Sequence, residues 1–370
     1  MAFGLSILLF VVSLFLIVMI HEGGHYLAAR RFNFRVLEYF LGFGPKLWSF
    51  RRGEIEYGVK AIPAGGYVKI AGMNPFENDV PEGDEHRAYT AKPVWQRITV
   101  ILAGPFSHFV VAYLIFAAVY FFAANWSIPG IAAVDPLING QPSPAAVAGL
   151  QPGDVILRIG DLGQPNPDEV GAYQAAHVGQ AIVYVLDRDG QEVTLTATPV
   201  MTKTDGVTGA RIGIQMAGVK EGAIGALEHA GGSIWDTTRE AATGITTVFG
   251  PAGFQRTYSQ LFNGAPRDEG GGVSLIGVGQ VAGHAGSQGA WARYFTLFAT
   301  VVLFIGLLNL LPFPPLDGGH VAIALIEKAR GKRIDMKKVV PVSAIVLLIL
   351  GFFSISAMIL DVWKPIQSGP

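Results

Sequence analysis

The chain has 370 residues, of which 51% are hydrophobic and 15% are charged, and its mean hydropathy is +0.41. Such a sequence is too apolar for an ordinary soluble domain, so it predicts an integral membrane protein. The formal net charge of -1 gives no reason to expect nucleic-acid binding. Because the chain has no cysteine, disulfides and thiolate metal ligands are excluded, and any zinc must be bound by histidine and carboxylate groups.

Four apolar segments have about the length that a helix needs to cross a bilayer, roughly 20 residues. They are residues 5–29, 98–124, 291–311 and 339–362. The first segment lacks a basic N-terminal region and a cleavage site of small residues, so we expect a retained span rather than a signal peptide. The excursion between the second and third spans is polar and interrupted by proline and glycine, and it is long enough to form a soluble domain.

Lysine and arginine are concentrated in two of the predicted loops. Eleven lie in residues 30–97 and six lie in residues 328–338, whereas none precedes the first span. Since lysine and arginine favour the cytoplasmic side of a membrane, these two loops are expected to face the cytoplasm. A multi-pass protein of the inner or plasma membrane is therefore predicted, with both termini and the excursion 125–290 outside the cytoplasm.

The end of the first span carries His21, Glu22 and His25 in an H-E-x-x-H pattern. On a helix, residues four apart lie on one face, so both imidazoles can bind one metal ion while Glu22 lies beside a water as a general base. Each ionisable group near a bilayer centre costs about 2.5–3.5 kcal/mol on insertion scales, which makes a functional site the default interpretation. We therefore predict a zinc site near the cytoplasmic end of this span.

Two histidines leave a catalytic zinc short of one protein ligand. The end of the third span supplies Asp317, eight positions after Asn309, and the three prolines between them prevent a regular helix. Irregular backbone at membrane depth is tolerated where protein or a water-filled cavity satisfies it. Asp317 is thus expected to meet the two histidines. Alternatively, Asp317 is only a turn residue at the mouth of a loop, because Asp-Gly is a common turn dipeptide. Asn309 could likewise serve only to cap or cross-link helices.

Several motifs occur in one order along the chain: His21-Glu22-Gly23-Gly24-His25, Gly42-Phe43-Gly44-Pro45, Pro63-Ala64-Gly65-Gly66-Tyr67-Val68, Ala103-Gly104-Pro105 and residues 309–319. Together they resemble the site-2 protease family of intramembrane zinc metalloproteases, and most of all its bacterial members with a single PDZ domain. The resemblance implies that His21, His25 and Asp317 bind Zn2+. It also implies that Glu22 is the general base and that Asn309 holds substrate or stabilises charge.

The sequence departs from the family's pattern at His108. The family usually has asparagine three positions after the proline of its Ala-Gly-Pro motif, and this chain has histidine there. One interpretation is a hydrogen-bonded packing residue between helices. The other is a proton relay or an auxiliary metal ligand, and the residues alone leave both open.

Residues 54–72 contain two short alternating runs around a proline and paired glycines, which predicts a β-hairpin. A protease must hold a helical substrate extended, and a hairpin edge can do so by adding the substrate as a strand. The resemblance implies that the hairpin re-enters the membrane beside the active site, with Gly65, Gly66 and Tyr67 as substrate-binding residues. A solvated cytoplasmic hairpin is the alternative.

Residues 149–159 and the strand-like runs 181–186 and 193–197 resemble a bacterial PDZ domain, which we place at residues 126–201. Its groove, expected near residues 131–134, would bind an extended peptide or a trimmed substrate end. The alternative is a steric cap that binds nothing and excludes substrates with bulky extracellular parts.

Residues 202–290 are predicted to connect this domain to the third span. A possible amphipathic helix carries apolar residues on one side, namely Ile234, Ala241, Ile245, Val248 and Phe249. It is expected either on the outer membrane surface or against the PDZ domain. The glycine-rich stretch 264–289 is expected to form a mobile connector with short extended segments.

The expected fold is a mostly α membrane protein with four transmembrane helices, a re-entrant β-hairpin and an extracytoplasmic α+β PDZ domain. Residues 1–124 hold the first two spans, the zinc motif and the hairpin, and residues 291–370 hold the last two spans and the third zinc ligand. Between them lie the PDZ domain and the connector.

The resemblance implies an intramembrane zinc endopeptidase that cleaves single-span membrane proteins, such as anti-sigma factors or remnant signal peptides, in regulated intramembrane proteolysis. One alternative is a PDZ-bearing membrane scaffold or receptor with a structural or vestigial metal site. The intact Glu22 argues against it, because a structural zinc does not need that carboxylate. A second alternative, a membrane-anchored protease of soluble chains, needs no aspartate ligand inside the membrane.

Overall fold

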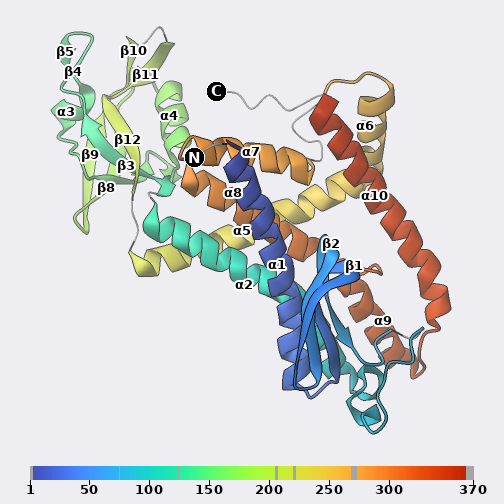
Figure 1. Ribbon diagram of the computed structural model, residues 1–370. Helices are drawn as coiled ribbons and strands as arrows, with labels where there is room; N and C mark the ends of the chain where they lie inside the picture. The colour runs from blue at the N-terminus through green and yellow to red at the C-terminus, as the bar shows by residue number, and fades with distance from the viewer. Residues whose placement is uncertain are drawn as a thin grey trace. The chain divides into compact units, whose positions relative to one another are not determined.

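The computed structural model describes residues 3–74, 76–123, 125–204, 207–219, 222–267 and 273–363. Within these residues, four helices are long and apolar enough to cross a membrane: α1 (Phe3–Arg31), α2 (Val94–Phe122), α8 (Trp291–Asn309) and α10 (Val339–Trp363) (Figure 1). They correspond to the four predicted spans, although residue 124, the predicted end of the second, lies outside the described residues. The protein is therefore a membrane protein, as its composition predicts.

The chain divides into two compact units. The first unit joins Met1–Phe116 to Ala230–Pro370 and contains the four apolar helices for most of their length, together with a curved sheet. The second unit, Ala117–His229, contains a separate sheet with two short helices. The residues of the predicted zinc site all belong to the first unit.

The sheet of the first unit pairs β1 (Val36–Arg52) with β2 (Ile55–Ile70) in an antiparallel arrangement with several register shifts (Figure 1). Residues 38–41 of β1 contact β2 twice, at residues 56–59 on one side and at residues 66–69 on the other. The C-terminal part of β2 therefore forms an edge of this sheet.

The prediction of a hairpin within residues 54–72 is wrong in its pairing. The two alternating runs belong to the single strand β2, and both pair with β1 rather than with each other. β1 bends at Gly42 and Gly44, whose φ angles of +86° and +81° strongly favour glycine. β1 is a partner that the sequence does not predict, although its aromatic and β-branched residues favour a strand.

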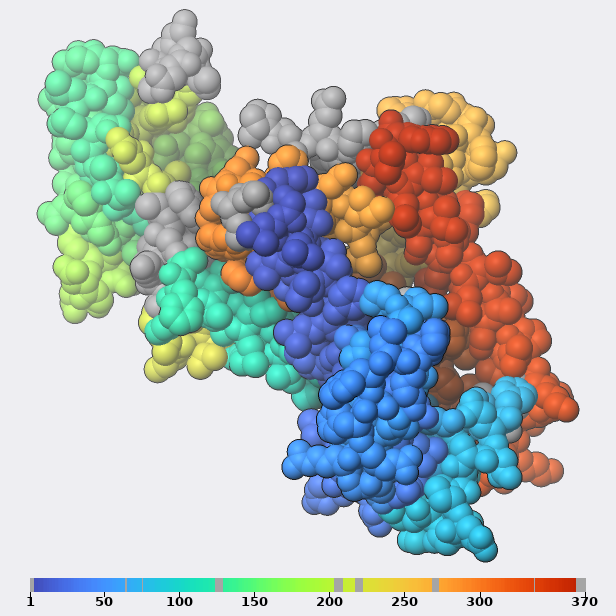
Figure 2. Space-filling view, viewed as in Figure 1, coloured from blue at the N-terminus to red at the C-terminus, as the bar shows by residue number. Residues whose placement is uncertain are grey.

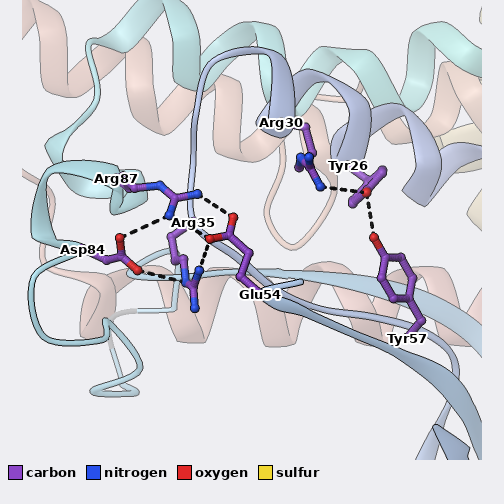
Figure 3. Close-up of polar contacts among 7 residues, drawn as sticks. All are labelled: Tyr26, Arg30, Arg35, Glu54, Tyr57, Asp84 and Arg87. Carbon is purple, nitrogen blue, oxygen red and sulfur yellow. Dashed lines mark hydrogen bonds and ion pairs between the residues drawn. The ribbon is translucent and has the colours of Figure 1, made fainter. Parts of the chain in front are cut away.

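Hydrogen bonds dock this sheet onto α1. The Tyr39 hydroxyl on β1 donates to the Met19 carbonyl oxygen over 2.6 Å. The hydroxyls of Tyr26 on α1 and Tyr57 on β2 lie 2.7 Å apart (Figure 3). These contacts fix the sheet beside the turns of α1 that carry the H-E-x-x-H motif.

Two arginines and two carboxylates hold the base of the sheet (Figure 3). Arg87 contacts Glu54 at 2.6 Å and Asp84 at 3.2 Å, and Arg35 contacts Asp84 at 3.1 Å and also Glu54. The hydrogen bond from Arg87 holds the pKa of Glu54 below its ordinary value. The network links the residue before β1, the residue before β2 and the loop that follows β2.

The second unit contains a six-stranded sheet with the order β12-β3-β6-β8-β9, in which β7 also pairs with β6. Its strands are β3 (Asn125–Val134), β6 (Val155–Ile159), β7 (Leu162–Gly163), β8 (Ile182–Arg188), β9 (Gln191–Ala197) and β12 (Ile214–Val219). Two-stranded pairs and two helices complete the unit: β4 (Leu137–Ile138) with β5 (Gln141–Pro142), β10 (Val200–Thr204) with β11 (Val207–Arg211), α3 (Pro144–Ala148) and α4 (Pro167–Ala176). The predicted strands at 181–186 and 193–197 are confirmed by β8 and β9.

The predicted groove strand, residues 131–134, does not lie at a sheet edge. It belongs to β3, which pairs with β12 on one side and with β6 on the other. The edge strand next to β3 is β12, which begins after residue 201, so this sheet extends past the predicted domain end. β12 is short and follows Gly213 with a φ of +90°, and local sequence does not reveal its long-range pairing with β3.

Three helices occupy most of the predicted connector: α5 (Ala223–Phe249), α6 (Pro251–Phe262) and α7 (Leu275–Ser287). The amphipathic helix predicted around residues 234–249 is confirmed by α5. The extended segments predicted within residues 264–289 are wrong for residues 275–287, which form α7, whereas residues 268–272 lie outside the described residues.

Close packing explains the glycines of α7. A Cβ added to Gly283 would lie 2.7 Å from the Phe3 ring, and one added to Gly286 would lie 2.6 Å from the Ser6 hydroxyl. Ser274 caps the helix, because its side chain accepts hydrogen bonds from the backbone N–H groups of the first turn. The glycines thus let α7 approach α1 closely, as small residues do between membrane helices.

The remaining elements are short, apart from one further helix. They are the 3-10 turns η1 (Glu85–Arg87), η2 (Tyr89–Ala91) and η3 (Met336–Lys338), and the helix α9 (Asp317–Arg330). α9 follows the proline-rich turn after α8 and begins at the predicted aspartate ligand. Residues 364–370, at the end of the predicted region 291–370, lie outside the described residues.

Candidate metal centre

The structure brings together His21, His25 and Asp317. The Nε2 atoms of the two histidines lie 3.1 Å apart, and the Asp317 Oδ2 atom lies 3.2 Å from His21 Nε2 and 3.4 Å from His25 Nε2. In a tetrahedral zinc site with bonds of about 2.0–2.1 Å, neighbouring donor atoms lie about 3.3 Å apart. The spacing of the three donor atoms therefore suits a zinc ion, which these residues would hold.

The turn between α8 and α9 delivers Asp317 to this position. A Cβ on Gly318 would lie 2.1 Å from the Leu310 carbonyl oxygen, and one on Gly319 would lie 2.2 Å from the Pro314 nitrogen. Only glycine permits the turn to fold back so closely on the start of α9. Asn309 is half-buried and ends α8, so this turn also sets its distance from the ligand.

Glycines on α1 and α2 let these two helices approach at the same depth. A Cβ on Gly104 would lie 2.3 Å from His25 Nε2 and 2.9 Å from His21 Nε2. One on Gly24 would lie 2.3 Å from the Ala103 carbonyl oxygen. The glycine of the Ala-Gly-Pro motif therefore leaves room for the two imidazoles, a role that is not evident from the sequence alone.

Each of the two histidines has a partner on α2 for its outward nitrogen. His25 Nδ1 lies 2.8 Å from the Val100 carbonyl oxygen, and His21 Nδ1 lies 3.0 Å from His108 Nε2. Such outer partners orient metal ligands and fix their tautomers. The sequence gives no sign of the Val100 carbonyl, because any residue type supplies one.

Glu22 lies beside the edge of β2. Its Oε2 atom accepts a hydrogen bond from the Val68 backbone N–H over 3.0 Å. A Cβ on Gly66 would lie 3.1 Å from the Phe40 carbonyl oxygen and 3.2 Å from the Met19 sulfur, so glycine there lets β2 pack closely on β1 and α1. The candidate base, the candidate ligands and a strand edge therefore share one small region of the first unit.

The side chain of Tyr67 is occupied within the sheet. Its hydroxyl donates to Glu38, and its ring stacks on the rings of Phe40 and Phe43 at centroid distances of 5.9 and 6.0 Å. Gly65 has a φ of +136°, which bends the strand just before this point. The phenol of Tyr67 is therefore engaged within the sheet.

The chain is similar to known metalloproteases along most of its length. The model of Peptidase family M50 matches residues 9–353. The zinc metalloprotease Rip1 of Mycobacterium tuberculosis is 30% identical over 413 aligned positions, which cover 99% of both chains. The metalloprotease MmpA of Caulobacter vibrioides is 32% identical over 385 positions, which cover 95% of this chain and 93% of that protein.

These matches span nearly the whole chain, so they include both apolar helices that flank the candidate metal centre as well as the sheet beside it. Rip1 is named a zinc metalloprotease, and the two histidines and the aspartate of this chain form a donor set that suits this ion. This chain therefore belongs to peptidase family M50, the site-2 protease family, and is a zinc metalloprotease.

Proposed function

We propose that this chain is an intramembrane endopeptidase that cleaves single-span membrane proteins within or near their transmembrane segment. The main support is the convergence of His21 and His25 on α1 with Asp317, which begins α9 after the turn that follows α8. Both α1 and α8 are apolar helices of membrane-spanning length. A protease of soluble chains does not need its ligands on such helices. Anti-sigma factors and remnant signal peptides are the proposed substrate classes, in regulated intramembrane proteolysis.

The proposed roles follow the positions of the groups. His21, His25 and Asp317 hold the zinc, which when bound supplies a Lewis acid for the scissile carbonyl and acidifies water. Glu22 accepts a proton from the attacking water and passes it to the leaving amine, as a carboxylate beside the reacting atoms can do. Asn309, at the end of α8, contacts the substrate.

The edge of β2 is the proposed holder of the substrate. A peptide bond inside a helix is shielded and hydrogen-bonded, so cleavage needs an extended segment, and an exposed strand edge provides one by pairing. The backbone around Gly65, Gly66 and Tyr67 lies in the part of β2 that, among the described residues, pairs with β1 on one side only. Next to it, the Val68 N–H donates to the Glu22 carboxylate. A substrate strand added there enters the region of the candidate ligands.

The apolar surface of the β1–β2 sheet supports its re-entry into the membrane. Figure 2 shows these strands at the surface of the first unit. Leu47 is 69% exposed, Trp48 60% and Ile62 53%, and such residues at a strand bend are unfavourable in water. These side chains are more favourable in contact with lipid than with water, so we favour a sheet inserted in the membrane over a solvated sheet in the cytoplasm.

The second unit is the proposed PDZ domain. Its support is a sheet with α4 and a capped α3, together with an edge strand, β12, that is able to pair with an extended peptide. A trimmed substrate end is the proposed ligand, and steric exclusion of bulky extracellular parts is the competing role. The cations in the loops support the proposal that this unit and both termini lie outside the cytoplasm, with the metal centre toward the cytoplasmic side.

Co-expression with a tagged single-span substrate tests the proposal. Glu22→Gln removes the base and keeps the size of the side chain, so we expect loss of cleavage with zinc retained in the purified variant. Cleavage by Glu22→Gln at the native rate would remove Glu22 from the mechanism. A native chain that cleaves only soluble proteins would contradict the intramembrane function.

A further inference from the structure

His108 on α2 is hydrogen-bonded on both sides of its ring. It is 2% exposed, with Nε2 lying 3.0 Å from His21 Nδ1 and Nδ1 lying 3.0 Å from the Val302 carbonyl oxygen on α8. A residue that merely fills space between helices needs neither partner. His108 therefore joins three helices through polar contacts at the depth of the candidate ligands.

The partners assign the protons along this chain of contacts. A carbonyl oxygen only accepts, so His108 Nδ1 carries the hydrogen and donates to Val302. The lone pair of His108 then lies on Nε2 and accepts from the His21 Nδ1 hydrogen. His21 is left with its lone pair on Nε2, the atom that lies 3.2 Å from the Asp317 carboxylate.

The surrounding helices leave room for this imidazole. A Cβ on Gly306 of α8 would lie 2.6 Å from the His108 Cβ atom. The His108 and His21 rings meet edge to face, with centroids 5.0 Å apart and planes at 65°. The His108 ring therefore sits between α1 and α8 in a space that a larger residue at position 306 would close.

We propose that His108 is a positioning residue for the metal centre, which holds His21 in the tautomer and orientation that bind zinc. The inference rests on the proposed role of His21 as a ligand. The same contacts argue against the two other roles. Both ring nitrogens of His108 are engaged in hydrogen bonds, so neither is free to bind the metal. The partner of Nδ1 is a backbone carbonyl oxygen, which cannot transfer a proton onward, so a proton relay through His108 would end there.

Zinc affinity of the purified full chain, measured by competition with a chelator, tests this proposal. His108→Leu keeps an apolar side chain of moderate size but removes the acceptor, and loss of such an outer partner typically weakens metal binding about 10–100-fold. His108→Gln keeps an oxygen acceptor near the Nε2 position, so we expect it to recover most of the affinity. Ser107→Ala is the matched control on the same helix, because the Ser107 hydroxyl donates to the Gly104 carbonyl oxygen one turn away on α2.

Helix content and melting temperature identify a loss that comes from unfolding. If His108→Leu does not fold, His108→Met provides a more adaptable apolar replacement. Native affinity in both the folded apolar variant and His108→Gln would overturn the proposal, and so would equal losses in the two. In cobalt-substituted protein we expect unchanged coordination number in the apolar variant, and loss of a nitrogen ligand would instead make His108 a ligand.

His21→Ala separates this inference from the proposed function. Loss of zinc in His21→Ala together with native affinity in His108→Leu would overturn the positioning role alone. Native affinity in His21→Ala would overturn the ligand assignment, and the positioning role with it.

Discussion

The Glu22 carboxylate accepts a hydrogen bond from the backbone N–H of Val68, 3.0 Å away. This contact joins the candidate base on α1 to the edge of β2, where the substrate is proposed to add as a strand. A substrate carbonyl that pairs with the Val68 N–H would compete with Glu22 for the same donor. Substrate binding is thereby expected to release the carboxylate toward the reacting water.

Val68→Pro removes the N–H group, whereas Val68→Ala keeps it. A hydrogen bond to a charged group contributes about 1.5–3 kcal/mol, so we expect cleavage to fall roughly 10–100-fold in Val68→Pro relative to Val68→Ala. Zinc content is expected to stay native in both, because neither change touches the ligands. Equal cleavage rates for the two folded variants would show that the Val68 N–H has no part in catalysis.

Gly104→Ala is expected to abolish tight zinc binding. The added methyl group would lie 2.3 Å from His25 Nε2, and a contact so short forces α1 and α2 apart or turns the imidazole. Gly351→Ala on α10 is the matched control, since a Cβ there meets nothing within 4 Å and alanine favours a helix. Zinc titration of the two purified variants distinguishes them, and native affinity in Gly104→Ala would be incompatible with the close approach of the helices.

The ion-pair network in Figure 3 predicts a pH-dependent contribution to stability. The hydrogen bond from Arg87 lowers the pKa of Glu54 below its ordinary value of 4.5. A carboxyl group whose pKa is lowered by folding stabilises the folded protein at pH values above its pKa in the unfolded state. This stabilisation is lost as the pH falls through its pKa in the folded state. We therefore expect Glu54→Gln to lower the melting temperature at neutral pH, by an amount that shrinks below about pH 4.5.

Glu82→Gln, an exposed position in the loop that follows β2 and carries Asp84 and Arg87, is the control for this measurement. Its melting temperature is expected to follow that of the native chain across the pH range. A difference between native and Glu54→Gln that stays constant from neutral to acidic pH would remove the Glu54 carboxylate from the stability of the sheet.

A cysteine-labelling experiment tests whether the β1–β2 sheet enters the membrane. The chain has no cysteine, so a single one introduced at Leu47 or at Glu82 reports that position alone. Leu47 is 69% exposed on the protein itself, yet we expect Leu47→Cys to react slowly with a polar maleimide in membranes and quickly in detergent. Glu82→Cys in opened vesicles is the accessible reference, and equal rates in membranes would place the sheet in water.

Local patterns in the sequence predict the parts of the fold that depend on local chemistry. The apolar runs give the four spans, and the spacing of His21 and His25 places both on one helix face. The ligand requirement of zinc identifies Asp317 as their partner, and the structure brings the three together. The strands β8 and β9 follow from their alternation.

Long-range pairings explain the parts that the sequence does not reveal. Residues 54–72 look like a self-contained hairpin, because nothing local shows that residues 38–41 lie between the two runs. The glycines of α7 look like a flexible connector until Gly283 and Gly286 are seen against α1. The Val68 N–H is a backbone group, so no residue type marks it.

The zinc affinity of Asp317→Ala tests the central claim, that one ion is held by residues from α1 and from the start of α9. Asp335→Ala is the control, because Asp335 is an exposed aspartate that bonds the Lys337 backbone N–H instead. We expect one tightly bound zinc per chain in the native protein and in Asp335→Ala, and a large loss of affinity in folded Asp317→Ala. Native zinc affinity in Asp317→Ala would contradict the claim.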